Sequence, residues 1–209
     1  MGIPVEVPGL DTIIPELGDG QLVVVDGTTD PAKSFFVRGL CLSAIRKHWP
    51  VTFVTSRDRA ELLGQLSTEG GNGLIGGDLV EIRERDVVHS LDEFATKGGL
   101  LAVDSFSFLT LDLGPARLAE LLRSLRAVGR DKLTTVVLTT DRGMSDGRSE
   151  AIATHLADGM FQFHAKEGPE GLLRYLRIPK WADGRFVDRN IYYDFDGKRI
   201  AIDLRRRVL

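Results

Sequence analysis

Short runs of aliphatic and β-branched residues, each followed by a helical pattern, are the feature that most limits how this chain can fold. The first run, Gln21–Val25, is almost entirely apolar and ends at an Asp-Gly turn. Such a run is typical of a strand buried on both faces, as in a parallel sheet. The segment Ala32–Lys47 then places apolar residues at helical spacing until Pro50 stops the pattern. The opening unit is therefore predicted to be a strand, a turn and a helix.

The same alternation continues along the chain. We expect further strands at Val51–Thr55, Leu79–Ile82, Leu100–Val103 and Thr134–Thr139, and helices at Arg59–Leu66, Ser90–Thr96 and Pro115–Val128. The last helix is the most clearly amphipathic, because its leucines share one stripe. The helix at Ser90 is expected to begin with a capping box, since Glu93 stands three residues on. Strands that alternate with helices predict an α/β fold with a mostly parallel central sheet flanked by helices. The ligand site of such a fold lies at the carboxyl ends of the strands.

From Gly159 onward the pattern changes to short strand-like segments separated by turn signals. The segments are Gly159–His164, Leu172–Ile178, Ile191–Phe195 and Ile200–Leu204, and Asp196-Gly197 is a good hairpin turn. We expect them to be antiparallel strands added to the same sheet. Residues 1–209 are then predicted to form a single domain.

Composition narrows the class of protein further. The 209 residues are 43% hydrophobic and carry 27 basic and 30 acidic side chains, giving a net charge of −3, which is typical of a globular protein. The mild negative charge argues against broad electrostatic binding of nucleic acid, which needs a concentrated basic face, although it leaves room for a local basic patch, so we do not expect a nucleic-acid partner. No apolar stretch approaches the roughly 20 residues of a membrane span, and no signal peptide is visible. We therefore expect a cytoplasmic protein with no membrane span. The single Cys41 and four scattered histidines argue against a structural zinc site.

The turn after the first strand carries the strongest chemical signal. Its sequence, Gly27-Thr28-Thr29-Asp30-Pro31-Ala32-Lys33-Ser34, partly matches the phosphate-binding P-loop pattern G-x-x-x-x-G-K-[ST] and stands between a predicted strand and a predicted helix. In a P-loop, backbone N–H groups and the lysine hold the phosphates, while the hydroxyl reaches Mg²⁺. ATP and Mg²⁺ are therefore the candidate ligands. The candidate nucleotide-binding residues are Gly27, Thr28, Thr29, Asp30, Ala32, Lys33, Ser34 and Phe35.

Three substitutions weaken this match. Pro31 removes an N–H group whose bond to phosphate would be worth about 1.5 to 3 kcal/mol, Ala32 stands where the consensus has glycine, and Asp30 adds a negative charge. These losses predict triphosphate binding weakened about a hundredfold or abolished, because each 1.4 kcal/mol is about tenfold in affinity. The alternative is an ordinary turn in which Asp30 caps the helix and Pro31 occupies its first turn.

Asp104 follows the strand predicted at Leu100–Val103, which is the position of a Walker B aspartate that helps to hold Mg²⁺. Ser34 and Asp104 are therefore the candidate metal ligands. The alternative for Asp104 is that it caps the loop that follows.

Taken in order, these motifs resemble those of the KaiC-like ATPases of the RecA superfamily, which are common in archaea and include archaellum and gas-vesicle regulators. Gly9-Leu10-Asp11 followed by Gly20 resembles the entry to the P-loop strand. Leu156–Met160 resembles the LADG segment, and Arg174–Lys180 the R-x-L-x-V-x-K strand. The resemblance covers nearly the whole chain. It implies a RecA-like fold, ATP and Mg²⁺ as ligands, and assembly with a regulatory protein partner or into a homo-oligomer such as a hexamer.

The resemblance also implies a catalytic glutamate pair after the second strand, but the matching positions hold Ser56 and Arg57. Asp58, one residue later, is the remaining candidate for the base. Lys180 matches the lysine that the family inserts into the neighbouring subunit. Ala182 replaces the matching arginine, which leaves Arg185 as the candidate substitute. The leading hypothesis is therefore a regulatory or assembly protein with weak or no ATP hydrolysis, a degenerate rather than an active ATPase.

Two other functions stay open. One is an active ATPase of the recombinase-paralogue type that acts with DNA or a protein partner, with Asp58 or Glu61 as the base. In that case the loop Gly143–Gly147 would contact DNA, although it holds no aromatic residue to stack on bases. The other is a structural scaffold that binds no nucleotide.

Overall fold

The computed structural model describes residues 2–28, 30–71, 80–83, 85–168, 171–184 and 187–203. Its centre is a nine-stranded sheet with the order β11-β10-β9-β8-β3-β7-β6-β4-β5. The strands of this sheet are β3 (Leu22–Gly27), β4 (Val51–Thr55), β5 (Val80–Arg83), β6 (Leu100–Asp104), β7 (Thr135–Asp141), β8 (Gly159–Gly168), β9 (Gly171–Lys180), β10 (Val187–Phe195) and β11 (Ile200–Ile202). A separate small hairpin joins β1 (Ile3–Pro4) to β2 (Glu16–Leu17).

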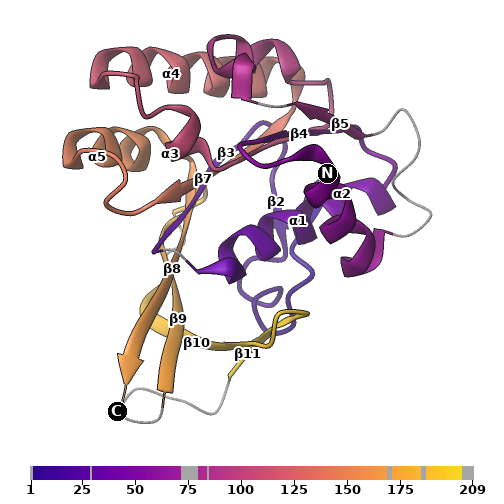
Figure 1. Cartoon of the computed structure of the whole chain (residues 1–209), viewed down its shortest axis with the longest axis vertical. Coiled ribbons are helices and arrows are strands. Elements are labelled where there is room, and N and C mark those ends of the chain that lie inside the picture. The colour runs from indigo at the N-terminus through magenta and orange to yellow at the C-terminus, as the bar shows by residue number, and fades with distance from the viewer. Residues whose placement is uncertain are drawn as a thin grey trace.

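Helices cover both faces of the sheet (Figure 1). They are α1 (Pro31–Arg46), α2 (Arg59–Leu66), α3 (Phe106–Leu109), α4 (Pro115–Lys132) and α5 (Gly147–Leu156). A π-helical turn, Ser67–Gly71, extends α2, and a 3₁₀ segment, Arg85–Phe94, precedes β6. No helix in the described ranges is long and apolar enough to cross a membrane.

The alternating side chains of the strands divide the core into two main layers. Val23 and Val25 of β3 pack with α1 and with the N-terminal hairpin, whereas Leu22 packs with α3 and α4 on the opposite face. Figure 1 shows this division, with α1 and α2 on one side of the sheet and α3, α4 and α5 on the other. The strands of the parallel part are buried on both faces, which is why they read as continuous apolar runs.

The predicted α/β fold with a mostly parallel sheet is confirmed. β3 pairs in parallel with β7 and β8, and β4 pairs in parallel with β5 and β6. Strands β9, β10 and β11 add an antiparallel meander at one edge. The strand expected at Leu79–Ile82 is β5, of which Leu79 lies outside the described residues.

One local prediction holds only in part, and another is wrong. The strand predicted to be antiparallel at Gly159 is β8, which pairs antiparallel with β9 but in parallel with β3, because α5 carries the chain back across the sheet before β8 begins. The helix predicted to start at Ser90 is a 3₁₀ segment from Arg85 to Phe94, and Ser90 interrupts it with a non-helical backbone at φ −130°. The spacing of Ser90 and Glu93 therefore does not mark the start of a helix here.

Candidate functional site at the carboxyl ends of the strands

The turn between β3 and α1 lies where the carboxyl ends of the parallel strands meet. Gly27 ends β3 and pairs with Asp141 of β7 on one side and Phe163 of β8 on the other. A Cβ at Gly27 would lie 2.4 Å from the carbonyl oxygen of Phe163, so only glycine fits between the neighbouring strands. Thr28 is exposed, and Thr29 lies outside the described residues. In open α/β sheets this edge is where ligands bind.

The carboxylate of Asp30 caps the N-terminus of α1. Its Oδ1 atom accepts a hydrogen bond from the backbone N–H of Ala32 at 2.8 Å, and Pro31 occupies the first helical position. Its Oδ2 atom accepts from Nε of Arg174, on β9, at 2.9 Å, and only 1% of the side chain is exposed. The predicted alternative, in which Asp30 caps the helix and Pro31 lies in its first turn, describes this geometry.

Lys33 is buried and turned toward β7. Its Nζ donates to the carbonyl oxygen of Thr140 at 2.7 Å and forms an ion pair with the carboxylate of Asp141. The second oxygen of Asp141 accepts from the Ser105 hydroxyl at 2.5 Å. The charge that a P-loop lysine offers to phosphate is therefore neutralised within the chain.

The remaining predicted residues lie nearby on α1 and β6. Ala32 and Ser34 are buried in the first turn of α1, and Phe35 packs its ring 5.3 Å from that of Phe195 at the end of β10. Asp104 is buried at the end of β6, two strands from β3, and its Oδ1 accepts from the Thr139 hydroxyl at 2.6 Å. Ser105 rather than Asp104 caps the helix that follows, because its hydroxyl accepts from the N–H of Phe108.

The positions that would hold catalytic carboxylates are engaged in local structure. Ser56 accepts from the N–H of Ser105 at 3.3 Å. Arg57 pairs with Glu61 one helical turn on, with 3.2 Å between Nη1 and Oε1. Asp58 is exposed and caps α2, accepting from the N–H groups of Ala60 at 2.7 Å and Glu61 at 3.2 Å. The one acidic side chain in the expected segment therefore holds a helix end.

Lys180 lies away from the P-loop of its own chain. It ends β9 beside Met160 of β8, and its Nζ donates to the carbonyl oxygens of Thr154 at 3.3 Å and His155 at 2.9 Å, at the end of α5. Burial and the neighbouring charge of Arg126 lower the pKa of Lys180, against the opposite effect of Asp158. Arg185 lies outside the described residues.

Sequence reasoning missed the partners that hold the loop, namely Arg174 and Asp141. It also missed Asp26, which accepts from the Thr140 hydroxyl at 3.1 Å and pairs with Arg142. All of these contacts join residues that are far apart in sequence. Arg174 belongs to the R-x-L-x-V-x-K segment, but that pattern alone does not indicate a partner for Asp30.

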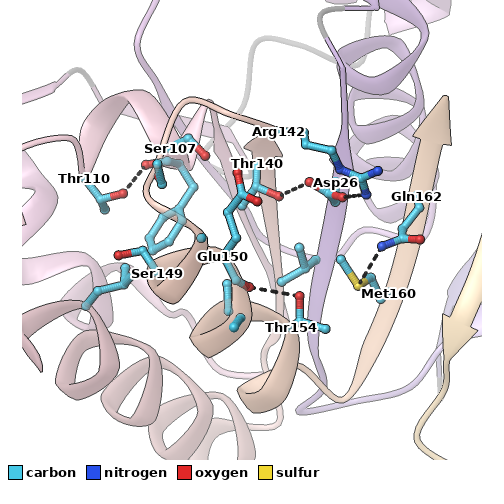
Figure 2. Close-up of a pocket in the computed structure, with 17 residues that line it drawn as sticks. Asp26, Ser107, Thr110, Thr140, Arg142, Ser149, Glu150, Thr154, Met160 and Gln162 are labelled. Carbon is cyan, nitrogen blue, oxygen red and sulfur yellow. Dashed lines mark hydrogen bonds and ion pairs between the residues drawn. The ribbon is translucent and has the colours of Figure 1, made fainter. Parts of the chain in front are cut away.

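A pocket of about 290 Å³ lies on the opposite face of the sheet from α1, beneath α5 (Figure 2). Hydroxyl groups, including those of Ser107, Thr110 and Thr154, line it together with the Asp26–Arg142 pair. Glu150 is held on one wall by the N–H of Gly143, at 2.7 Å. This pocket is lined by neither Lys33 nor Ser34, so it is separate from the P-loop site.

The contacts within this loop would have to rearrange before it could hold a magnesium triphosphate. The group would need Lys33, Ser34 and Asp104, yet Asp30 occupies the Ala32 N–H and Lys33 is bound to Asp141. A negatively charged ligand would have to displace the Asp30 carboxylate from the start of α1 and separate Lys33 from Asp141.

Solved structures identify the class of fold. The chain matches a KaiC-like protein, PH0186, from Pyrococcus horikoshii OT3 with a TM-score of 0.78 and 21% identity, over 97% of this chain and 99% of that one. It also matches the flagellar accessory protein FlaH from Methanocaldococcus jannaschii with a TM-score of 0.79 and 16% identity, over 97% and 98% of the two chains. No protein-family model and no curated protein sequence matches. The protein therefore has the RecA-like fold of the KaiC-like proteins, as the sequence motifs predicted.

Proposed function

We propose that the protein is a cytoplasmic regulatory or assembly protein of KaiC-like fold, whose degenerate P-loop binds ATP and Mg²⁺ weakly and does not hydrolyse ATP efficiently. The observation that carries this proposal is the buried carboxylate of Asp30, which accepts from the Ala32 N–H and pairs with Arg174. The carboxylate is an anion at a helix N-terminus, which is the place where a P-loop holds phosphate.

A phosphate group entering this loop must compete with Asp30 for the same donors. It would break the charge-assisted hydrogen bond that Arg174 donates to Asp30, and the carboxylate of Asp30 would then repel it. It would also have to draw Lys33 away from Asp141. Each such bond contributes about 1.5 to 3 kcal/mol, so we expect an affinity for ATP in the millimolar range.

Hydrolysis requires a base that orients water, and the candidate segment provides none that is free. Asp58 caps α2 and Glu61 pairs with Arg57. The retained fold then serves contacts with other proteins or other copies of the chain. A hexamer in which Lys180 and Arg185 reach the neighbouring subunit stays a prediction, since Lys180 is held by carbonyl oxygens of α5 in the single chain.

The test is calorimetric titration of the purified protein with ATP and Mg²⁺, alongside the Asp30→Asn, Asp30→Gly and Lys33→Ala variants. Asn at position 30 keeps the capping oxygen and removes the charge, so the fold is retained while repulsion is lost. We expect millimolar binding by the natural chain and at least tenfold tighter binding by Asp30→Asn. Phosphate release should equal that of Lys33→Ala.

Two results would contradict the proposal. Micromolar binding by the natural chain, together with phosphate release well above the Lys33→Ala variant, would indicate an active ATPase. No heat with any of the variants, in protein whose circular dichroism shows native structure, would indicate a scaffold that binds no nucleotide.

A further inference from the structure

Helices α4 and α5 form an outer layer with an apolar groove between them. The two helices lie next to each other on the side of the sheet opposite α1 (Figure 1). The groove has a volume of about 700 Å³ and its lining is mainly apolar. It is lined by Pro115, Ala116, Ala119, Glu120 and Arg123 of α4, and by Arg148, Ala151, Ile152, His155 and Leu156 of α5.

Small side chains on the floor of the groove leave the helix backbones open to close approach. Ala116 and Ala151 are exposed, and Ile152 and Leu156 are only half-buried. These residues belong to two helices, so the apolar surface is continuous rather than a set of single exposed residues. Continuous apolar surface rimmed by polar side chains is typical of interaction sites. A groove between two helices accepts the apolar face of a third.

The charged side chains that line the groove are mainly basic. They are Arg123 of α4, Arg148 at the start of α5 and one acidic residue, Glu120. Two other basic residues of α4, Arg126 and Arg130, pair with Asp158 and do not line the groove. The groove is therefore apolar along its floor, and Arg123 and Arg148 give its rim an excess of positive charge.

The start of α4 adds a second feature that favours an acidic partner. Gly114 provides no side-chain cap, and the first turn of α4 contains no acidic residue. By contrast, α1, α2, α3 and α5 are capped by Asp30, Asp58, Ser105 and Asp146. Pro115 and Ala116, in this uncapped first turn, line the groove. An acidic side chain from a partner would complete the cap and interact favourably with the helix dipole.

From the apolar floor, the basic rim and the uncapped helix end, we infer that the groove between α4 and α5 binds an acidic amphipathic helix of a partner protein. This inference rests on the proposed function, because it gives a regulatory or assembly protein its partner surface. Nucleic acid is the less suitable occupant, since the lining of the groove contains no Phe, Tyr or Trp and offers bases a single ring, that of His155.

The experiment measures binding of the full chain to a dye-labelled synthetic peptide by fluorescence anisotropy. The peptide is an 18-residue helix with leucines on one face and glutamates on its flanks, and a control peptide replaces every glutamate by lysine. The natural chain is expected to bind the glutamate peptide at least tenfold more tightly. The charge-reversed variant Arg123→Glu/Arg148→Glu should lose at least tenfold in affinity for it.

Two further variants distinguish binding in the groove from a general effect of the net charge of the chain. Lys166→Glu/Arg177→Glu changes the net charge by the same amount at exposed positions of β8 and β9, and should bind like the natural chain. Ala116→Trp fills the groove at an exposed position and should abolish binding while the circular dichroism stays native. Equal binding of both peptides, or no effect of Ala116→Trp, would overturn the inference.

Two other occupants would appear as distinct results. Concentration-dependent dimers that Ala116→Trp abolishes would assign the groove to a second copy of the chain. Displacement of the peptide by a single-stranded oligonucleotide of similar affinity would assign it to nucleic acid. Either result would overturn the inference. ATP binding and phosphate release test the proposed function, whereas peptide binding tests the groove. A failure of one proposal can therefore be told from a failure of the other.

Discussion

At the scale of single residues, Gly27 at the start of the P-loop has no room for a side chain. A Cβ added there would lie 2.4 Å from the Phe163 carbonyl oxygen, which is fixed in the neighbouring strand. We expect Gly27→Ala to lower the free energy of unfolding by about 2 kcal/mol or more, because overpacking between two strands forces the backbone to shift. Urea denaturation measures the change.

The matched control is Gly39→Ala, inside α1. A Cβ at Gly39 would meet nothing within 4 Å, and alanine is favoured over glycine in a helix by about 0.5 to 1 kcal/mol. This variant should therefore be slightly more stable than the natural chain. Equal stability of the Gly27→Ala variant and the natural chain would show that β3 and β8 do not pack as described.

Part of the candidate site could be predicted from the sequence, and part could not. Gly27 and Asp104 lie at the ends of β3 and β6, and Lys33 lies at the start of α1, as predicted, because strand, turn and helix patterns are local. The capping role of Asp30 was one of two predicted alternatives for the same reason. Its pairing with Arg174 was not predictable, because the two residues are 144 positions apart and meet only through the register of β8 with β9.

At the scale of elements, Asp158 joins α4, α5 and β3. Its Oδ1 accepts from Arg126 at 2.5 Å and from Arg130 at 3.0 Å, and its Oδ2 accepts from the N–H of Leu22 at 3.0 Å. Burial acts to raise the pKa of this carboxyl, but the hydrogen bonds from Arg126 and Leu22 and the charges of both arginines outweigh it. The pKa of Asp158 is therefore below its ordinary value.

A lowered pKa in the folded state means that Asp158 contributes stability above its unfolded pKa of about 3.9. The contribution is lost as the pH falls through the folded-state pKa. We expect Asp158→Asn to cost about 1.5 to 3 kcal/mol at pH 7 and much less near pH 2. Urea denaturation across this pH range checks the expectation, and a cost that stayed constant with pH would contradict it.

The elements differ in how readily the sequence revealed them. Strands β3, β4 and β6 were predicted because burial on both faces leaves uninterrupted apolar runs. Helix α5 was not predicted, since Gly147 opens it and only Ser149 and Ala153 are fully buried along it. Without α5 there was no crossover before β8, so the parallel pairing of β8 with β3 was not predicted, although its antiparallel pairing with β9 was. A short helix with a weak apolar stripe therefore determines one of the two pairings of this strand.

At the scale of the whole molecule, the parallel and antiparallel parts of the sheet share one core layer. Val23 and Val25 of the parallel strand β3 pack in the same cluster as Ile191, Tyr193 and Ile200 from the C-terminal strands. Cores shared in this way link the unfolding of their parts. The prediction that residues 1–209 form a single domain thus becomes a prediction of one cooperative transition.

Two tryptophans on different parts of the chain allow this prediction to be tested. Trp49 lies between α1 and β4, whereas Trp181 follows β9 and packs 5.2 Å from the ring of Phe161. In the single-tryptophan variants Trp49→Phe and Trp181→Phe, fluorescence should report the same denaturation midpoint as circular dichroism of the same variant. A lower midpoint for Trp181 fluorescence than for circular dichroism would show that the antiparallel strands unfold first as a separate unit. Coincident midpoints in both variants would mean that contacts made at the α4–α5 groove and at the P-loop act on one cooperatively folded body.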